Sequence, residues 1–156
     1  MRTNRLFLAL GVGLSLLLVA CGGQTGNTGG GVSGPGSTWT LRNSGTEKHL
    51  YGVAYGTIGN DKYFVAVGEG GTIRTSPDGV NWTPRESGTY YPLSGVTYGN
   101  GTFVAVGNGG TIRTSPDGVN WTPVQNSGTT QPLYGVTYGN GTFVAVGEGG
   151  TILTSP

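Results

Sequence analysis

Short blocks of apolar and aromatic residues, separated by glycine-rich turns, recur along residues 38–156. The block Val96–Tyr98 is followed by Gly99–Gly101, and an Asn-Gly pair between two such blocks is typical of a tight β-hairpin turn. The next block, Phe103–Val106, is apolar without alternation, which predicts a strand covered on both faces of its sheet. The helical period is absent from this pattern, so we expect an all-β fold.

A unit of about 40 residues is present in three copies. Gly135–Pro156 matches Gly95–Pro116 at every position but two, and an earlier copy begins at Gly52. Each unit continues with a glycine turn, a third short strand such as Thr111–Thr114, and a fourth strand that opens at a tryptophan. Four strands in a repeat of this length are typical of β-propeller blades. The differing positions are Asn108, which becomes Glu148, and Arg113, which becomes Leu153; the three tryptophans are Trp39, Trp82 and Trp121.

Three blades are fewer than the roughly four to eight that surround a propeller axis. The repeats begin with a fourth strand at Trp39 and stop at Pro156, at the end of a third strand. The N-terminal strand at Trp39 could therefore complete the last blade. We therefore expect an incomplete propeller, and three explanations stay open. The chain is a fragment of a longer propeller, two chains form a homodimer that closes a six-bladed ring, or the domain is a monomeric arc.

The first 20 residues differ from the rest of the chain. Arg2 and Arg5 precede the apolar run Leu6–Ala20, which is short for a transmembrane helix and predicts a signal peptide. Leu18–Cys21 resembles the lipobox of bacterial lipoproteins, and Cys21 is the sole cysteine of the chain. This resemblance implies cleavage before Cys21, a lipid on that residue, and anchoring to a membrane of the bacterial cell envelope, the outer membrane if one exists.

Three segments follow from these patterns: a signal peptide (1–20), a lipidated cysteine with a tether (21–37), and the blade repeats (38–156). The tether is rich in Gly, Ser and Thr and predicts a flexible coil. Loss of Arg2 and Arg5 with the signal peptide leaves six basic residues against seven acidic ones, a net charge of −1. This balance offers no basic patch, and nucleic acid is excluded as a partner.

Candidate catalytic residues are scarce. His49 is the only histidine and Cys21 is assigned to lipidation, so Ser-His-Asp, Cys-His and histidine-rich metal sites are excluded. Catalysis needs unlike groups around one reacting atom, whereas the repeats present like groups, such as Glu69 and Glu148. We expect no enzyme activity, no metal and no cofactor.

The most specific motif is the turn Ser-Pro-Asp-Gly-Val-Asn-Trp, which occurs at Ser76–Trp82 and Ser115–Trp121. It resembles the Asp-box of sialidase-like (BNR-type) propellers, one residue shorter than the usual spacing, and the resemblance implies a structural role. The carboxylate is expected to accept hydrogen bonds within its own turn, the glycine to take a positive φ, and the tryptophan to pack between blades. The residues concerned are Ser76, Asp78, Gly79, Trp82, Ser115, Asp117, Gly118 and Trp121.

Candidate ligand-binding residues lie in the second-to-third turns and in the connections between blades, where the copies differ most. We expect a non-catalytic binding or scaffold module for protein or carbohydrate. The alternatives are a fragment of a glycoside-hydrolase or sialidase-like enzyme, although the arginine triad of sialidases is missing, and an assembly factor for a membrane complex. Tyr90 and Tyr91 could instead cover a seam between blades, and the glutamates could be solvated turn residues. The candidates are Glu69, Asn108, Glu148, Tyr90, Tyr91 and His49.

Overall fold

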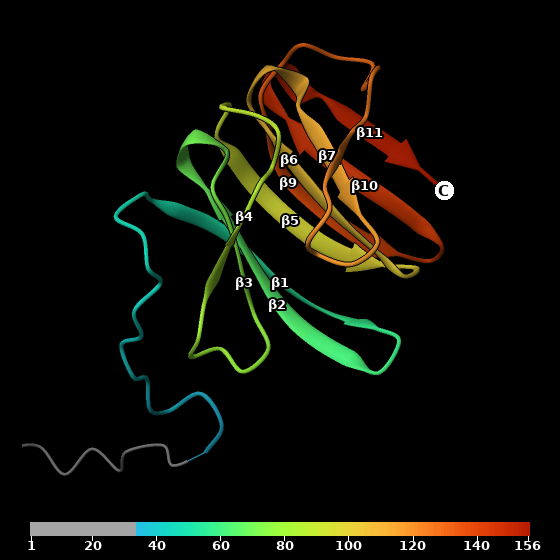
Figure 1. Cartoon of the computed structure of the whole chain (residues 1–156). Helices are drawn as coiled ribbons and strands as arrows, with labels where there is room; N and C mark the ends of the chain where they lie inside the picture. The colour runs from blue at the N-terminus through green and yellow to red at the C-terminus, as the bar shows by residue number, and fades with distance from the viewer. Residues whose placement is uncertain (1–33) are drawn as a thin grey trace, which may run out of the picture. The chain divides into compact units, whose positions relative to one another are not determined.

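The computed structural model describes residues 34–156, so the predictions for the signal peptide, for Cys21 and for most of the tether lie outside the described residues. The described residues belong to two units, 34–39 and Thr40–Pro156, and the second contains all the strands described below. They comprise 11 strands and three short 3-10 turns, without an α-helix (Figure 1). The prediction of an all-β fold is confirmed.

Three antiparallel sheets follow one another along Thr40–Pro156, and the strands of each sheet pair in chain order. We call them blades 1, 2 and 3. Blade 1 contains β1 (Leu50–Ile58), β2 (Asp61–Gly68), β3 (Ile73–Ser76) and β4 (Thr83–Arg85). Blade 2 contains β5 (Leu93–Gly99), β6 (Thr102–Gly107), β7 (Ile112–Ser115) and β8 (Thr122–Pro123). Blade 3 contains β9 (Leu133–Gly139), β10 (Thr142–Gly147) and β11 (Ile152–Ser155).

The hairpin turns of blades 2 and 3 have the conformation that an Asn-Gly pair favours. Asn100 and Gly101 have φ angles of 47° and 74°, and Asn140 and Gly141 have 49° and 76°. Two consecutive positive φ angles define the turn whose twist matches that of the flanking strands. The predicted hairpins at these sites are confirmed.

The fourth strands are short, and the prediction of one at Trp39 is wrong. Residues 38–49 contain no strand, whereas β4 and β8 pair with the third strand of their own blade. A fourth strand needs a third strand beside it, and the described residues supply none ahead of Thr40. Among these residues β11 has no fourth strand either, so blade 3 has three strands.

Glycines allow the first strands of neighbouring blades to approach each other closely. A Cβ atom at Gly52 would lie 3.1 Å from the Cα of Gly95, and one at Gly95 would lie 3.3 Å from the Cα of Gly135. A larger residue at Gly52 or Gly95 would force the blades apart. The sequence therefore places glycine where backbone meets backbone.

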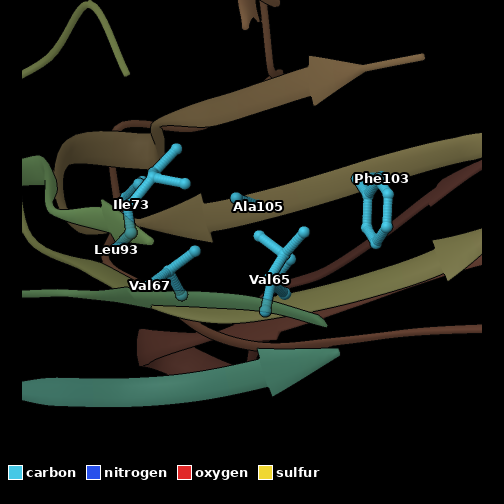
Figure 2. Packing of buried hydrophobic residues seen from close by; sticks show 7 residues of the cluster. Val65, Val67, Ile73, Leu93, Phe103 and Ala105 are labelled. Atoms are coloured by element: carbon cyan, nitrogen blue, oxygen red, sulfur yellow. The ribbon is translucent and has the colours of Figure 1, made fainter. Parts of the chain in front are cut away.

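Each pair of neighbouring blades encloses an apolar seam. In seam 1–2, blade 1 contributes residues of β2 and β3, and blade 2 contributes residues of β5 and β6 (Figure 2). Seam 2–3 repeats this arrangement one blade further along. Buried residues of seam 1–2 are Val65, Val67, Ile73, Leu93, Val96, Phe103 and Ala105, and those of seam 2–3 are Val104, Val106, Leu133 and Ala145. The sheets do not close on themselves, as expected for an incomplete propeller.

Candidate functional site

The strand order divides the loops of each blade between two ends. Because consecutive strands are antiparallel, the β1–β2 and β3–β4 turns share one end, and the β2–β3 turn lies at the other. The Asp-containing turns, Ser76–Trp82 and Ser115–Trp121, lie at the first, which we call the turn end. The 3-10 turns Glu69–Gly71, Asn108–Gly110 and Glu148–Gly150 lie at the second, with the connections between blades. We call it the connection end.

At the turn end of blade 1, Asp78 is the centre of a closed hydrogen-bond network. Its Oδ1 accepts hydrogen bonds from the backbone N–H groups of Val80 and Asn81, both at 2.8 Å. Its Oδ2 accepts one from the Asn81 side chain at 2.7 Å. The Ser76 hydroxyl donates to Asp78 Oδ1 at 3.0 Å and accepts from the N–H of Gly79 at 2.8 Å.

The turn of blade 2 repeats this network and adds a contact with seam 1–2. Gly118 has a φ of 71°, and a Cβ atom there would lie 3.5 Å from Val65 of blade 1. The Trp121 indole N–H donates to the Gly118 carbonyl at 3.1 Å, and its ring lies 6.5 Å from that of Phe103. The turn therefore covers one edge of the seam.

Both turn carboxyls have lowered pKa values. Hydrogen bonds from the backbone N–H of Asn81, then from that of Val80 and from the Asn81 side chain, hold the pKa of Asp78 well below its usual range. Partial burial acts to raise the pKa of Asp117, but hydrogen bonds from Asn120, Val119 and Ser115 together outweigh it and lower the pKa to about 2. These ionised carboxylates are occupied within their own turns, so they are poor general acids at neutral pH.

At the connection end of blade 1, Glu69 and His49 lie together. The Glu69 N–H donates to the His49 carbonyl at 2.8 Å, and the His49 N–H donates to Glu69 Oε2 at 3.3 Å. The Lys48 ammonium lies 3.8 Å from Glu69 Oε1. This glutamate therefore fastens its turn to the connection that enters the same blade.

Tyr90 and Tyr91 lie on the connection that enters blade 2. Tyr91 packs over the neighbouring 3-10 turn, since a Cβ atom at Gly109 would lie 3.6 Å from its ring. Tyr90 is 96% exposed. The two rings border a shallow cavity of about 590 Å³, which Gly88, Thr89, Thr111 and Arg113 also line.

Asn108 and Glu148 occupy the equivalent turns of blades 2 and 3. The Asn108 N–H donates to the Pro92 carbonyl at 3.0 Å, and the Glu148 N–H donates to the Pro132 carbonyl at 2.9 Å. The structure thus brings the candidates together blade by blade: Glu69 with His49, the Asn108 turn with Tyr91, and Glu148 with the connection that enters blade 3.

Arg113 lies beside the tyrosines, and sequence reasoning did not select it as a binding residue. Its Nη2 donates to the Gly88 carbonyl at 2.7 Å, and its Nε is buried without a hydrogen-bond partner among the described residues. The signal was present in the repeats, since Arg113 marks one of the two positions at which blade 2 differs from blade 3.

A second cavity, of about 450 Å³, lies between blades 2 and 3, and sequence reasoning also missed it. Its lining combines polar residues with apolar strand residues, among them Val104, Ile112, Phe143 and Leu153. The corresponding edge of seam 1–2 is covered by Gly118 and its turn. This cavity is therefore an uncovered edge of seam 2–3.

No protein-family model matches the chain, and no curated protein matches it. Among residues 34–156, no group of three or more His, Cys, Asp or Glu side chains is arranged to hold a metal ion. Within the same residues, none of the helical segments is long and apolar enough to cross a membrane.

Proposed function

We propose that this chain is a membrane-anchored, non-catalytic binding module of the β-propeller type, with a carbohydrate or protein ligand. Its relationship to bacterial lipoproteins with Asp-box (BNR-type) repeats is part of the proposal. The observation that carries it is the contrast between the two ends of the blades. The turn end repeats one closed network, whereas the connection end presents a different set of side chains on each blade.

The cavity that Tyr90 and Tyr91 border, which we call the tyrosine cavity, is the best candidate for the ligand site, and its chemistry favours a sugar. Exposed aromatic rings stack on the apolar faces of sugars, and neighbouring hydroxyl and guanidinium groups hydrogen-bond to sugar hydroxyls. Tyr90 and Tyr91 supply the rings, and Thr89, Thr111 and Arg113 supply the polar groups. The wide opening of this shallow site suits the end of a glycan chain.

A glycan array probed with the full chain tests this site. We expect the Kd for the bound glycan to rise at least about 10-fold in Tyr90→Ala/Tyr91→Ala, because stacking on each ring is lost. The matched control is Tyr134→Ser, which removes another exposed tyrosine and introduces the residue that blade 2 has at the equivalent position, Ser94. Binding that survives the double substitution, or an array without any bound sugar, would exclude this site as a glycan receptor.

The membrane anchor has its own test. Cys21→Ser removes the thiol that would carry the lipid, so we expect the chain to move from the membrane fraction to the soluble fraction, with loss of labelled fatty acid. Ser33→Ala, in the tether, is the control. Unchanged fractionation of Cys21→Ser would contradict the proposed anchor and leave the ligand site untouched.

A further inference from the structure

Apolar residues are exposed at both ends of the row of blades. On the outer face of blade 3, Val146 is 45% exposed and Ile152 is 67% exposed. On the outer face of blade 1, Leu50, Val53 and Tyr55 are exposed. Apolar side chains gathered on one face commonly mark an interaction surface.

The internal seams show what such faces bind. Tyr98 of blade 2 lies over Gly56 of blade 1, and Tyr138 of blade 3 lies over Gly99 of blade 2; a Cβ atom at either glycine would collide with the tyrosine ring. Gly139 is the equivalent glycine of blade 3, and a Cβ atom there would have no described heavy atom within 4 Å. Blade 3 therefore presents Gly139 on its outer face, but among the described residues no tyrosine ring covers it as Tyr98 covers Gly56.

The missing tyrosine is at the other end of the row. Tyr55 of blade 1 occupies the position of Tyr98 and Tyr138, and it faces away from blade 2. The other apolar residues follow the same rule, since each outer face carries one half of an internal seam. Blade 3 presents Val144, Val146 and Ile152, which correspond to Val65, Val67 and Ile73; blade 1 presents Leu50, Val53 and Phe64, which correspond to Leu93, Val96 and Phe103.

The strand edges are complementary too. In blade 1 the third strand pairs with Thr83–Arg85, in the register Arg74 opposite Pro84 and Thr75 opposite Thr83. Residues 40–42 are the repeat equivalent of Thr83–Arg85, and they are not in a strand. Leu41, the equivalent of Pro84, is 97% exposed. The unpaired edge of β11 corresponds to the edge of β3 on which Thr83–Arg85 lies.

We propose that the outer face of blade 3 binds blade 1 of a second copy of this chain, and that residues 40–42 of that copy pair with β11 as a fourth strand. In this register Leu41 lies opposite Leu153, and Thr40 lies opposite Thr154. The occupant is a second copy because its blade 1 carries the side chains that the internal seams already bind, in the same order along the strands.

A head-to-tail contact closes into a ring when the rotation between copies is right. Two copies have six blades, within the range of roughly four to eight that encloses a propeller axis, whereas three copies would have nine. We therefore expect a two-copy ring with both outer faces and both strand edges covered. The inference does not depend on the ligand proposed for the connection end.

Gly139→Leu is the sharpest test. The position is open in the single chain, so leucine leaves the blade intact, but in the dimer it would occupy the space that Tyr55 of the second copy needs. Native mass spectrometry of the full chain, released from detergent, counts the copies in each complex. We expect two copies for the wild-type chain and at least about a 100-fold weaker association for Gly139→Leu.

Tyr55→Ala provides the rescue, and Glu86→Leu provides the control. Removing the Tyr55 ring should make room for the leucine, so Gly139→Leu/Tyr55→Ala should regain at least about 10-fold in association over Gly139→Leu alone. Glu86→Leu places a leucine at another exposed position, outside the strands, and should leave the dimer unchanged. Circular dichroism and urea unfolding of each variant report whether the blades themselves remain folded.

A monomeric wild-type chain, a complex of three or more copies, or a dimer that Gly139→Leu leaves intact would each overturn the proposal. In the first and last cases the outer face of blade 3 would belong to another occupant, such as further repeats in a longer polypeptide. Loss of association without rescue by Tyr55→Ala would equally contradict the pairing of Tyr55 with Gly139.

Discussion

Residues 95–116 of blade 2 and residues 135–156 of blade 3 differ at two positions, yet their equivalent side chains lie in different surroundings. Val106 is fully buried, whereas Val146 is almost half exposed. Phe103 is fully buried between blades 1 and 2 and packs against Trp121, whereas Phe143, on the face of blade 3 that packs against blade 2, is only partly buried. Val146 lies on the outer face of blade 3, which has no neighbouring blade within the described residues, whereas blade 2 has a neighbour on each face. Burial in this fold therefore depends on the position of a blade in the row more than on its sequence.

The largest contrast should come from the paired substitutions Phe103→Ala and Phe143→Ala. Phe103 contacts the rings of Tyr98 and Trp121, and its removal leaves a cavity in seam 1–2. In the Gly139→Leu background, which keeps the chain single, we expect Phe103→Ala to lower the free energy of unfolding by about 3–5 kcal/mol, and Phe143→Ala by about half as much. Urea unfolding of both variants in that background measures the difference. Equal losses there would contradict the difference in burial between the two rings.

The glycines of the first strands should give the next largest difference. A Cβ atom at Gly99 would collide with the Tyr138 ring, whereas one at Gly139 has open space among the described residues. Gly99→Ala should therefore cost about 1–3 kcal/mol, and Gly139→Ala should be close to neutral in a monomer. Thermal unfolding of the two variants, at several protein concentrations, separates this effect from any loss of association.

Acid should destabilise the turn Ser115–Trp121 of blade 2 through its carboxylate, Asp117. The pKa of Asp117 is about 2 in the folded chain and about 3.8 for the free side chain. The folded state therefore favours the ionised form, and this stabilisation is present above about pH 4 and is lost as the pH falls towards 2. We expect about 1–2 kcal/mol to be lost over this range, discounted for the partial exposure of the carboxyl.

Asp117→Asn should flatten that pH dependence, because asparagine keeps an acceptor oxygen without the titrating proton. Asp61→Asn, at an exposed acid outside both turns, serves as the control and should follow the wild-type curve. Urea unfolding between pH 5 and pH 2 measures all three chains. A wild-type curve that runs parallel to that of Asp117→Asn would contradict the proposed role of the carboxylate in the turn.

The smallest effect concerns one of the two positions at which the blades differ. Arg113 donates a hydrogen bond to the Gly88 carbonyl, whereas the apolar side chain of Leu153 lies near Gly128, 3.9 Å from where a Cβ atom there would be, and donates none. Arg113→Leu gives blade 2 the residue of blade 3, and we expect it to cost about 1 kcal/mol through loss of that hydrogen bond. The reverse change, Leu153→Arg, tests whether the Gly128 carbonyl can accept the same bond. A stabilised Arg113→Leu variant would show that the unpaired Nε outweighs the hydrogen bond.

Local chemistry explains how much of the structure could be predicted from the sequence. The Asn100-Gly101 turn, the apolar second strand and the hydrogen bonds of the Asp117 turn depend on neighbouring residues, so their residue types predict them. The fourth strand at Trp39 failed because its pairing partner is not a neighbour in the chain. The role of Arg113 was missed for a related reason, since its partner, Gly88, belongs to the connection between two blades.

By itself, the sequence determined the all-β class, the repeated strands and the conformation of the tight turns, because each depends on interactions within a few residues or within one hairpin. The tertiary structure alone decided which copies of a residue are buried, that the tyrosine cavity forms beside Arg113, and that blades 1 and 3 expose complementary halves of one seam. Those features depend on which blade packs against which, and nearly identical repeats have the same local preferences whether or not a neighbour is present.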